Sequence, residues 1–231
     1  MRREARIGLA VVMLMAAVGT ASAGLSIKNS KHDLSSGATG VTYQATNTDQ
    51  ICVFCHTPHN AKQDIPLWNR SNPTGTFTLY SSSSMNNTPV KSGFTADSIS
   101  LFCMSCHDGA TGLGSAVHND PNGTPITMDA SGTVISGDAN LSTDLSDDHP
   151  VNFLVTADKI AADGNLGALN TATNPPTMNT TLTKGLPLFR SGRGDTTLEC
   201  GSCHSVHDNT DAPFLRTTMK GSLLCLGCHK K

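Results

Sequence analysis

The sequence predicts a mostly irregular, coil-rich fold with short α-helices and minimal β-structure, wrapped around an apolar core that side chains alone do not supply. Ser, Thr, Asn, Gly and Pro, which favour turns and loops, make up 99 of the 231 residues. Aromatic residues account for 4% and charged residues for 15%, against about 25% charged in an ordinary soluble domain. The chain is therefore either disordered or folded around some other apolar body. A net charge of −2 argues against nucleic-acid binding, which needs a basic surface.

Residues 1–23 are expected to form a secretory signal peptide. Three arginines within the first six residues precede an apolar stretch over residues 7–18, and Ala21-Ser22-Ala23 has the small side chains of a cleavage site. An apolar stretch this short does not cross a membrane. We therefore expect a secreted mature chain that begins near Gly24 and forms a single domain over residues 24–231.

All eight cysteines belong to one motif that occurs four times. The motifs are Cys52-x-x-Cys55-His56, Cys103-x-x-Cys106-His107, Cys200-x-x-Cys203-His204 and Cys225-x-x-Cys228-His229, called the first to the fourth motif below. C-x-x-C-H is typical of c-type haem attachment. The two thiols bond covalently to one porphyrin, and the adjacent histidine becomes an axial ligand of its iron. Four disulfides or two four-thiolate zinc sites would also use eight cysteines, but neither explains a histidine after every pair.

Four haem c groups would supply the apolar core that the composition lacks, as a stack with the polypeptide around it. Residues 24–50 are then an N-terminal arm, 51–109 hold haems one and two, 110–190 are a haem-free loop region, and 191–231 hold haems three and four. Helical turns are expected at each motif and around Ser98 to Cys106. A short strand is expected within Thr76 to Tyr80.

The remaining histidines are numerous enough to complete the iron coordination. His56, His107, His204 and His229 are the expected proximal ligands, and low-spin electron-transfer haems need a sixth ligand as well. We assign the distal role to His32, His59, His149 and His207, and treat His118 as the spare. His59 and His207 follow their proximal histidines by three residues. That tether is too short to pass round the porphyrin edge, so each should ligate the haem of another motif.

Several stretches of the sequence resemble a known group of proteins. The stretches are Cys52-Val-Phe-Cys-His-Thr-Pro-His-Asn60, Pro66-Leu-Trp-Asn-Arg70, Cys103-Met-Ser-Cys-His-Asp-Gly109 and Asp148-His-Pro-Val151. They resemble exported multihaem cytochromes of metal-reducing bacteria, and the order of the four motifs resembles the tetrahaem OmcE-type extracellular cytochrome nanowires. The resemblance implies a head-to-tail filament with a continuous haem chain, in which one distal ligand comes from a neighbouring subunit. The N-terminal arm makes His32 the expected donor in trans.

The leading functional hypothesis is long-range electron transfer by a filament outside the cell, without catalysis. Its expected partners are further copies of the chain, other redox proteins and extracellular metal oxides. The first alternative is a monomeric periplasmic electron carrier with the same haem chemistry. The second is a multihaem reductase, which needs one iron with an open face. The histidine count can fill every iron, so the reductase ranks last.

Overall fold

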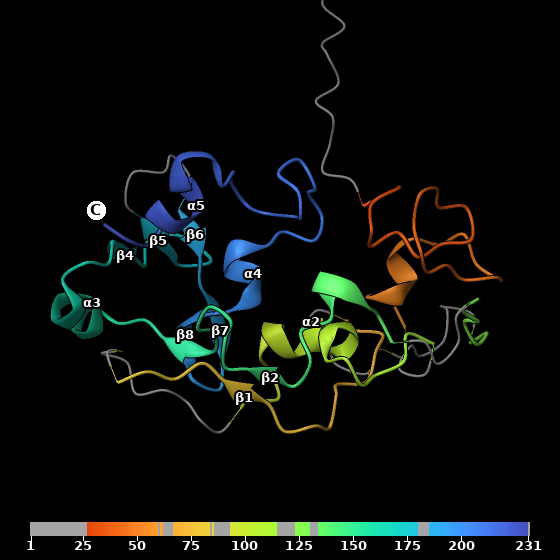
Figure 1. Ribbon diagram of the computed structural model, residues 1–231, viewed down its shortest axis with the longest axis horizontal. Helices are drawn as coiled ribbons and strands as arrows, with labels where there is room; N and C mark the ends of the chain where they lie inside the picture. The colour runs from red at the N-terminus through yellow and green to blue at the C-terminus, as the bar shows by residue number, and fades with distance from the viewer. Residues whose placement is uncertain are drawn as a thin grey trace, which may run out of the picture.

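The computed structural model describes residues 27–59, 61, 67–83, 85, 93–114, 123–129, 134–179 and 185–230. The expected signal peptide over residues 1–23 and the spare His118 lie outside these ranges. Viewed with its longest axis horizontal, the molecule has the N-terminal arm at one end and the C-terminal segment near the other (Figure 1). The helical turns of the four motifs follow one another along this axis in chain order.

The helices are short, and the four helical turns expected at the motifs are present. The α-helices are α2 (Ile99–His107), α3 (Ala157–Asp163), α4 (Cys200–Cys203) and α5 (Leu223–Leu226). The 3₁₀ helices are η2 (Cys52–Phe54), η3 (Gly137–Ala139) and η4 (Lys220–Ser222). None of the helices in the described ranges has both the length and the apolar character needed to cross a membrane.

The prediction of minimal β-structure is wrong. Two antiparallel sheets have three strands each, in the orders β3-β8-β7 and β4-β5-β6, and β1 pairs with β2 in parallel. The strands are β1 (Thr78–Leu79), β2 (Asp144–Leu145), β3 (Phe153–Leu154), β4 (Ala168–Asn170), β5 (Thr177–Asn179), β6 (Leu186–Pro187), β7 (Phe189–Ser191) and β8 (Gly194–Leu198). Of the residues that the structure describes, 19% are helical and 19% lie in strands or bridges, so the fold mixes the two rather than being coil with helices.

The sheets form because a few apolar residues within the Thr- and Asn-rich stretch pair across long loops. Met178 on β5 is buried and lies opposite both Leu169 on β4 and Leu186 on β6. Leu198 on β8 is likewise buried and lies opposite Phe153 on β3. β-Branched threonine also favours strands. The prediction from composition counted threonine as a turn former and gave too little weight to its preference for strands.

The buried apolar side chains form three small clusters. The first contains Ala45, Val53, Phe54, Leu113, Ile126, Met128 and Ile135, the second Phe77, Leu79, Leu101, Met104 and Leu145, and the third Val155, Met178, Leu188 and Leu198. Cys55 and Cys106 pack against the first cluster, and Cys228 packs against the third. The apolar side chains thus gather beside the cysteine motifs.

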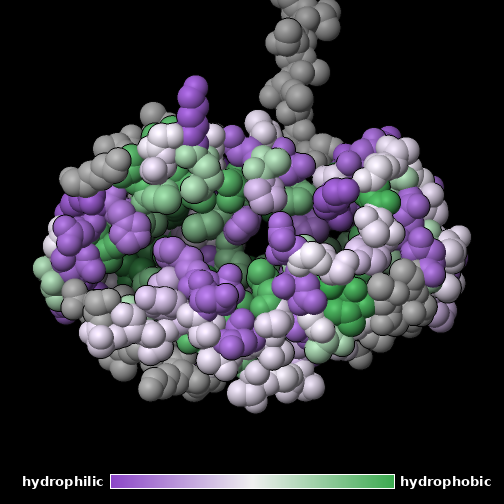
Figure 2. All heavy atoms as spheres, viewed as in Figure 1, coloured by the Kyte–Doolittle hydropathy of each residue, from purple (hydrophilic) through white to green (hydrophobic). Residues whose placement is uncertain are grey.

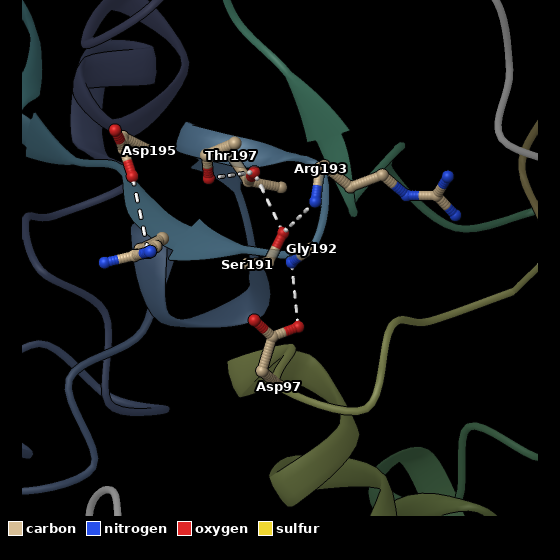
Figure 3. A network of polar contacts seen from close by, with 8 residues as sticks. Asp97, Ser191, Gly192, Arg193, Asp195 and Thr197 are labelled. Carbon is tan, nitrogen blue, oxygen red and sulfur yellow. Dashed lines mark hydrogen bonds and ion pairs between the residues drawn. The ribbon is translucent and has the colours of Figure 1, made fainter.

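Helix α2 is fastened to the β7-β8 hairpin and to α4 by polar contacts. The Asp97 carboxylate, just before α2, accepts a 2.8 Å hydrogen bond from the backbone N–H of Gly192 in the hairpin turn (Figure 3). The Ser191 hydroxyl donates to the Thr197 hydroxyl at 3.0 Å, which ties the two strands together. These contacts hold the second and third motifs side by side.

Candidate haem sites

Each motif is a single helical turn that places its two cysteines on one face. In the first, third and fourth motifs the histidine N–H donates to the carbonyl of the first cysteine at 2.8, 3.0 and 2.8 Å respectively. The second motif lies within helix α2. Residues three apart in a helical turn are neighbours on its surface. The two sulfurs of each motif therefore face the same side, as attachment to one porphyrin requires.

The pairing and placement of the cysteines disfavour the disulfide and zinc alternatives. All eight cysteines are free, and none forms a disulfide. Burial raises the pKa of Cys55 to about 12, with the nearby Cys106 thiol adding to the rise. Burial likewise raises the pKa of Cys228 to about 12. Among the described residues, no group of three or more His, Cys, Asp or Glu side chains is placed to hold a metal ion, which disfavours the zinc alternative.

Each junction between consecutive motifs brings cysteines together. At the first junction, Cys55 and Cys106 pack against the same apolar cluster. At the second junction, the Cys103 and Cys200 thiols lie next to each other, and this contact is the first cause, ahead of burial, of the raised pKa of Cys103. The second motif therefore meets the first motif with one cysteine and the third motif with the other.

The third motif repeats this arrangement. Its Cys200 faces Cys103, while its Cys203 lines the same cavity as Cys225 and Cys228 of the fourth motif. After burial, Cys203 is the next cause of the raised pKa of Cys228. The attachment points therefore form one unbroken series from the first motif to the fourth.

Three histidine pairs have the ring spacing of two axial ligands on one metal ion. A metal–imidazole bond is about 2 Å long and the ring centre lies about 1 Å beyond the nitrogen, so opposed ligands have ring centres about 6 Å apart. His107 and His32 have ring centres 6.2 Å apart, His56 and His207 also 6.2 Å, and His229 and His149 6.3 Å. Each pair joins the histidine of one motif to a histidine distant in the sequence.

Hydrogen bonds fix the tautomer of two of these histidines and of His204. The Nδ1–H groups of His107, His149 and His204 donate to the carbonyls of Ala139 at 2.7 Å, Pro150 at 3.0 Å and Pro213 at 3.1 Å. A carbonyl only accepts, so Nδ1 carries the proton and Nε2 keeps its lone pair. This is the usual outer-shell arrangement of a metal-bound histidine.

His32, in the N-terminal arm, lies beside the second motif of the same chain. Its ring stacks on Phe214 with centres 4.4 Å apart and meets His107 edge-on. The pKa of His32 is lowered to about 4, chiefly by burial and also by charge repulsion from His107, His204 and His207. The N-terminal arm thus folds back onto this chain. The donation of His32 to a neighbouring subunit stays a prediction.

Two predicted ligands have no ring partner in the part of the chain that the structure describes. His204 of the third motif is exposed, and its Nδ1 is held by Pro213. His59 is also exposed, and its carbonyl accepts a 2.8 Å hydrogen bond from the Thr57 hydroxyl. His207 faces His56 of the first motif rather than His204 of its own.

The fourth motif opens onto an apolar cavity of about 290 Å³. Cys225, Cys228, His229 and His149 line it together. The other lining side chains include Phe153, Val155, Leu166, Met178, Leu186 and Leu198. In Figure 2 apolar residues surround a hollow on this side of the molecule. Paired thiols, opposed imidazoles and an apolar wall are what a c-type haem needs, so the residues present fit that group.

Two buried charged residues at the junctions escaped the sequence analysis. Arg70 is 1% exposed, and its guanidinium donates to the Ser105 hydroxyl and to the carbonyls of Ser105 and Leu113 at 3.0–3.2 Å. Glu199 is also 1% exposed and lies between the second and third motifs. Glu199 directly precedes the third motif, and Arg70 ends one of the stretches that resemble multihaem cytochromes, but neither signal reveals burial.

Comparison with known proteins supports the haem-attachment interpretation. The family model described as a doubled CXXCH motif matches residues 194–231, which contain the third and fourth motifs. No curated protein matches the chain. The matched motif indicates covalent haem c binding and electron transfer, as in multihaem c-type cytochromes.

Proposed function

We propose that this protein binds four haem c groups, one per motif, and conducts electrons along them. Each haem supplies one reversible electron by cycling between Fe(III) and Fe(II). The polypeptide holds the porphyrins through eight cysteines, provides imidazole ligands on both faces and excludes water with three small apolar clusters. The observation that carries this proposal is the meeting of consecutive motifs through their cysteines, from Cys55 and Cys106 to Cys203 and Cys228.

The described rings support a specific ligand assignment. His32 pairs with His107, His207 with His56, and His149 with His229, because their ring spacings match two ligands on one metal ion. All three distal ligands come from segments far from the motif that they complete. A haem bound this way is held by the fold as well as by its thioether bonds.

Three paired sets of rings favour an electron carrier over an enzyme. A reductase needs an open coordination position for its substrate, whereas two imidazoles would leave none at the first, second and fourth motifs. The test is the spin state of the purified oxidised protein. Low-spin spectra from all four haems support the carrier. A resting high-spin haem, together with turnover of nitrite or hydroxylamine as probe substrates, would instead favour the reductase.

For the third motif we propose a ligand from another copy of the chain. His204 has a free Nε2 but no partner ring in the described residues, and His59 is exposed and also without one. The two belong to different motifs, the first and the third. If His59 of one subunit ligates the haem at His204 of the next, the contact is heterologous, repeats from copy to copy and builds an open filament where its rotation does not close a ring.

Electron microscopy of the secreted protein, combined with His59→Ala, tests this assembly. The wild-type protein should form filaments, and the variant should remain monomeric with one high-spin haem. Replacing His118 provides the matched comparison and should leave filaments and spectra unchanged. Discrete wild-type monomers with four low-spin haems would favour the periplasmic carrier. Loss of a low-spin haem in His118→Ala would assign the fourth ligand to His118 instead.

A further inference from the structure

Glu199 is a buried carboxyl group at the junction of the second and third motifs. It directly precedes Cys200, whose thiol lies next to that of Cys103. Its side chain lies among serines at the start of α2, and only 1% of the residue is exposed. Any charge on this carboxylate therefore acts on both haem sites through a dry environment, where electrostatic effects are strong.

The two oxygens of Glu199 have different surroundings. Oε2 accepts hydrogen bonds from the Ser98 hydroxyl at 2.7 Å, the Ser100 N–H at 3.3 Å and the Ser100 hydroxyl. Oε1 is buried and has no direct hydrogen-bond partner among the described residues, although Glu199 and Ser202 form a capping box at the start of α4. An ionised carboxylate would leave part of its charge on this unpartnered oxygen, which is costly in a buried site. A proton on Oε1 removes that charge and leaves the serine contacts to Oε2 in place.

From this geometry we infer that Glu199 takes up a proton when the second or third haem is reduced, so that electron transfer through this junction is coupled to proton binding. The inference rests on the proposed haem attachment. One electron from an external reductant converts Fe(III) to Fe(II), and one proton from water converts the Glu199 carboxylate to the acid. The added negative charge is thereby neutralised within the same buried region.

The surroundings of Glu199 raise the pKa of its carboxyl group. Burial raises the pKa of this carboxyl group, and the serine hydrogen bonds only partly offset the rise. The neighbouring Asp97 adds to it by charge repulsion. The thiols of Cys103 and Cys200 also lie close by, but they are not titratable once bonded to haem. Asp97 itself is exposed and points toward the β7-β8 turn (Figure 3).

Coupling between electron and proton binding is reciprocal. Protonated Glu199 favours the reduced haem, so the midpoint potential falls as pH rises between the pKa values of the oxidised and reduced states. At full coupling the ratio of reduced to oxidised haem changes tenfold per pH unit, or about 59 mV for a one-electron couple. Outside this pH window the potential is independent of pH.

Redox titration of the four-haem protein across pH, with Glu199→Gln beside it, tests the inference. Glutamine keeps the shape and is always neutral, so the variant should match the wild type at low pH. It should have the higher potential at high pH and no slope for that haem. Infrared difference spectra on reduction should show a protonated-carboxyl band in the wild type that the variant lacks.

Two further variants separate proton coupling from a purely structural role. Ser98→Ala removes a donor that favours the ionised form, so it should shift the pH-dependent window upward. Asp97→Asn, an exposed carboxylate in the same region, should keep the slope. A Glu199→Gln effect that is equal at every pH, or no effect, would overturn the inference while four bound haems left the proposed function standing. Failure to bind haem would overturn both.

Discussion

Replacing His149 by alanine should convert one haem in four from low spin to high spin. The His149 and His229 rings have centres 6.3 Å apart, and both line the cavity that contains Cys225 and Cys228. Removing His149 takes away one axial nitrogen but neither thiol. The covalent haem count should therefore stay at four, while a quarter of the low-spin signal is lost. Electron paramagnetic resonance and absorption spectra of the oxidised protein measure this fraction.

Added imidazole distinguishes lost ligation from general damage. It fits the space left by the missing ring and should restore the low-spin signal in His149→Ala. Asp147→Ala changes an exposed residue in the same turn and should leave the spectra unchanged. Four low-spin haems in His149→Ala, or a high-spin fraction that imidazole does not reverse, would refute the pairing of His149 with His229.

Three further substitutions test how the polypeptide supports the haem chain. Arg70→Lys keeps the charge, but a lysine cannot reach all three acceptors of the guanidinium. Leaving one or two buried acceptors unpaired should lower the free energy of unfolding, measured in denaturant, by about 2–4 kcal/mol. Arg216→Lys, at a more exposed arginine, should lower it by under about 1 kcal/mol. Gly194→Ala should lower the free energy of unfolding by about 1–3 kcal/mol, because Gly194 has φ 139° and a Cβ there would lie 2.6 Å from the Leu154 side chain. An unchanged melting temperature would contradict the β3-β8 packing. Asp33→Ala removes the carboxylate that accepts hydrogen bonds from the N–H groups of Asn29 and Ser35 and from the Ser35 hydroxyl at 2.6–3.2 Å. The change should loosen the N-terminal arm, speed its proteolysis and make part of the second haem high spin. Equal proteolysis rates would count against the folded arm.

The local features of the motifs could be predicted because they depend on short-range chemistry. A cysteine pair followed by histidine is a five-residue motif for haem attachment. A single helical turn places these residues as attachment requires. The strand expected within Thr76 to Tyr80 is present as β1. The remaining sheets could not be predicted, since strands of two to five residues have too little periodicity to stand out from loops. Their pairing depends on contacts such as Phe153 with Leu198, far apart in the chain.

The ligand set could be counted from the sequence, but its pairing could not be assigned. The short tether at His207 showed only that it should serve another motif. That His56 is its neighbour depends on how the first and third motifs pack. The burial of Arg70 and Glu199 has the same origin, because the side chain of Arg70 bonds to residues 35 and 43 positions away and that of Glu199 to Ser98, 101 positions away. No local pattern marks such residues as buried.

The intact mass of the mature protein, measured after acid denaturation and without reduction, is the most direct test of how this chain works. Four covalently attached haems, with all eight cysteines consumed as thioethers, are predicted. Fewer than four haems, intact disulfides or a colourless protein carrying zinc would contradict an electron path built on these four motifs.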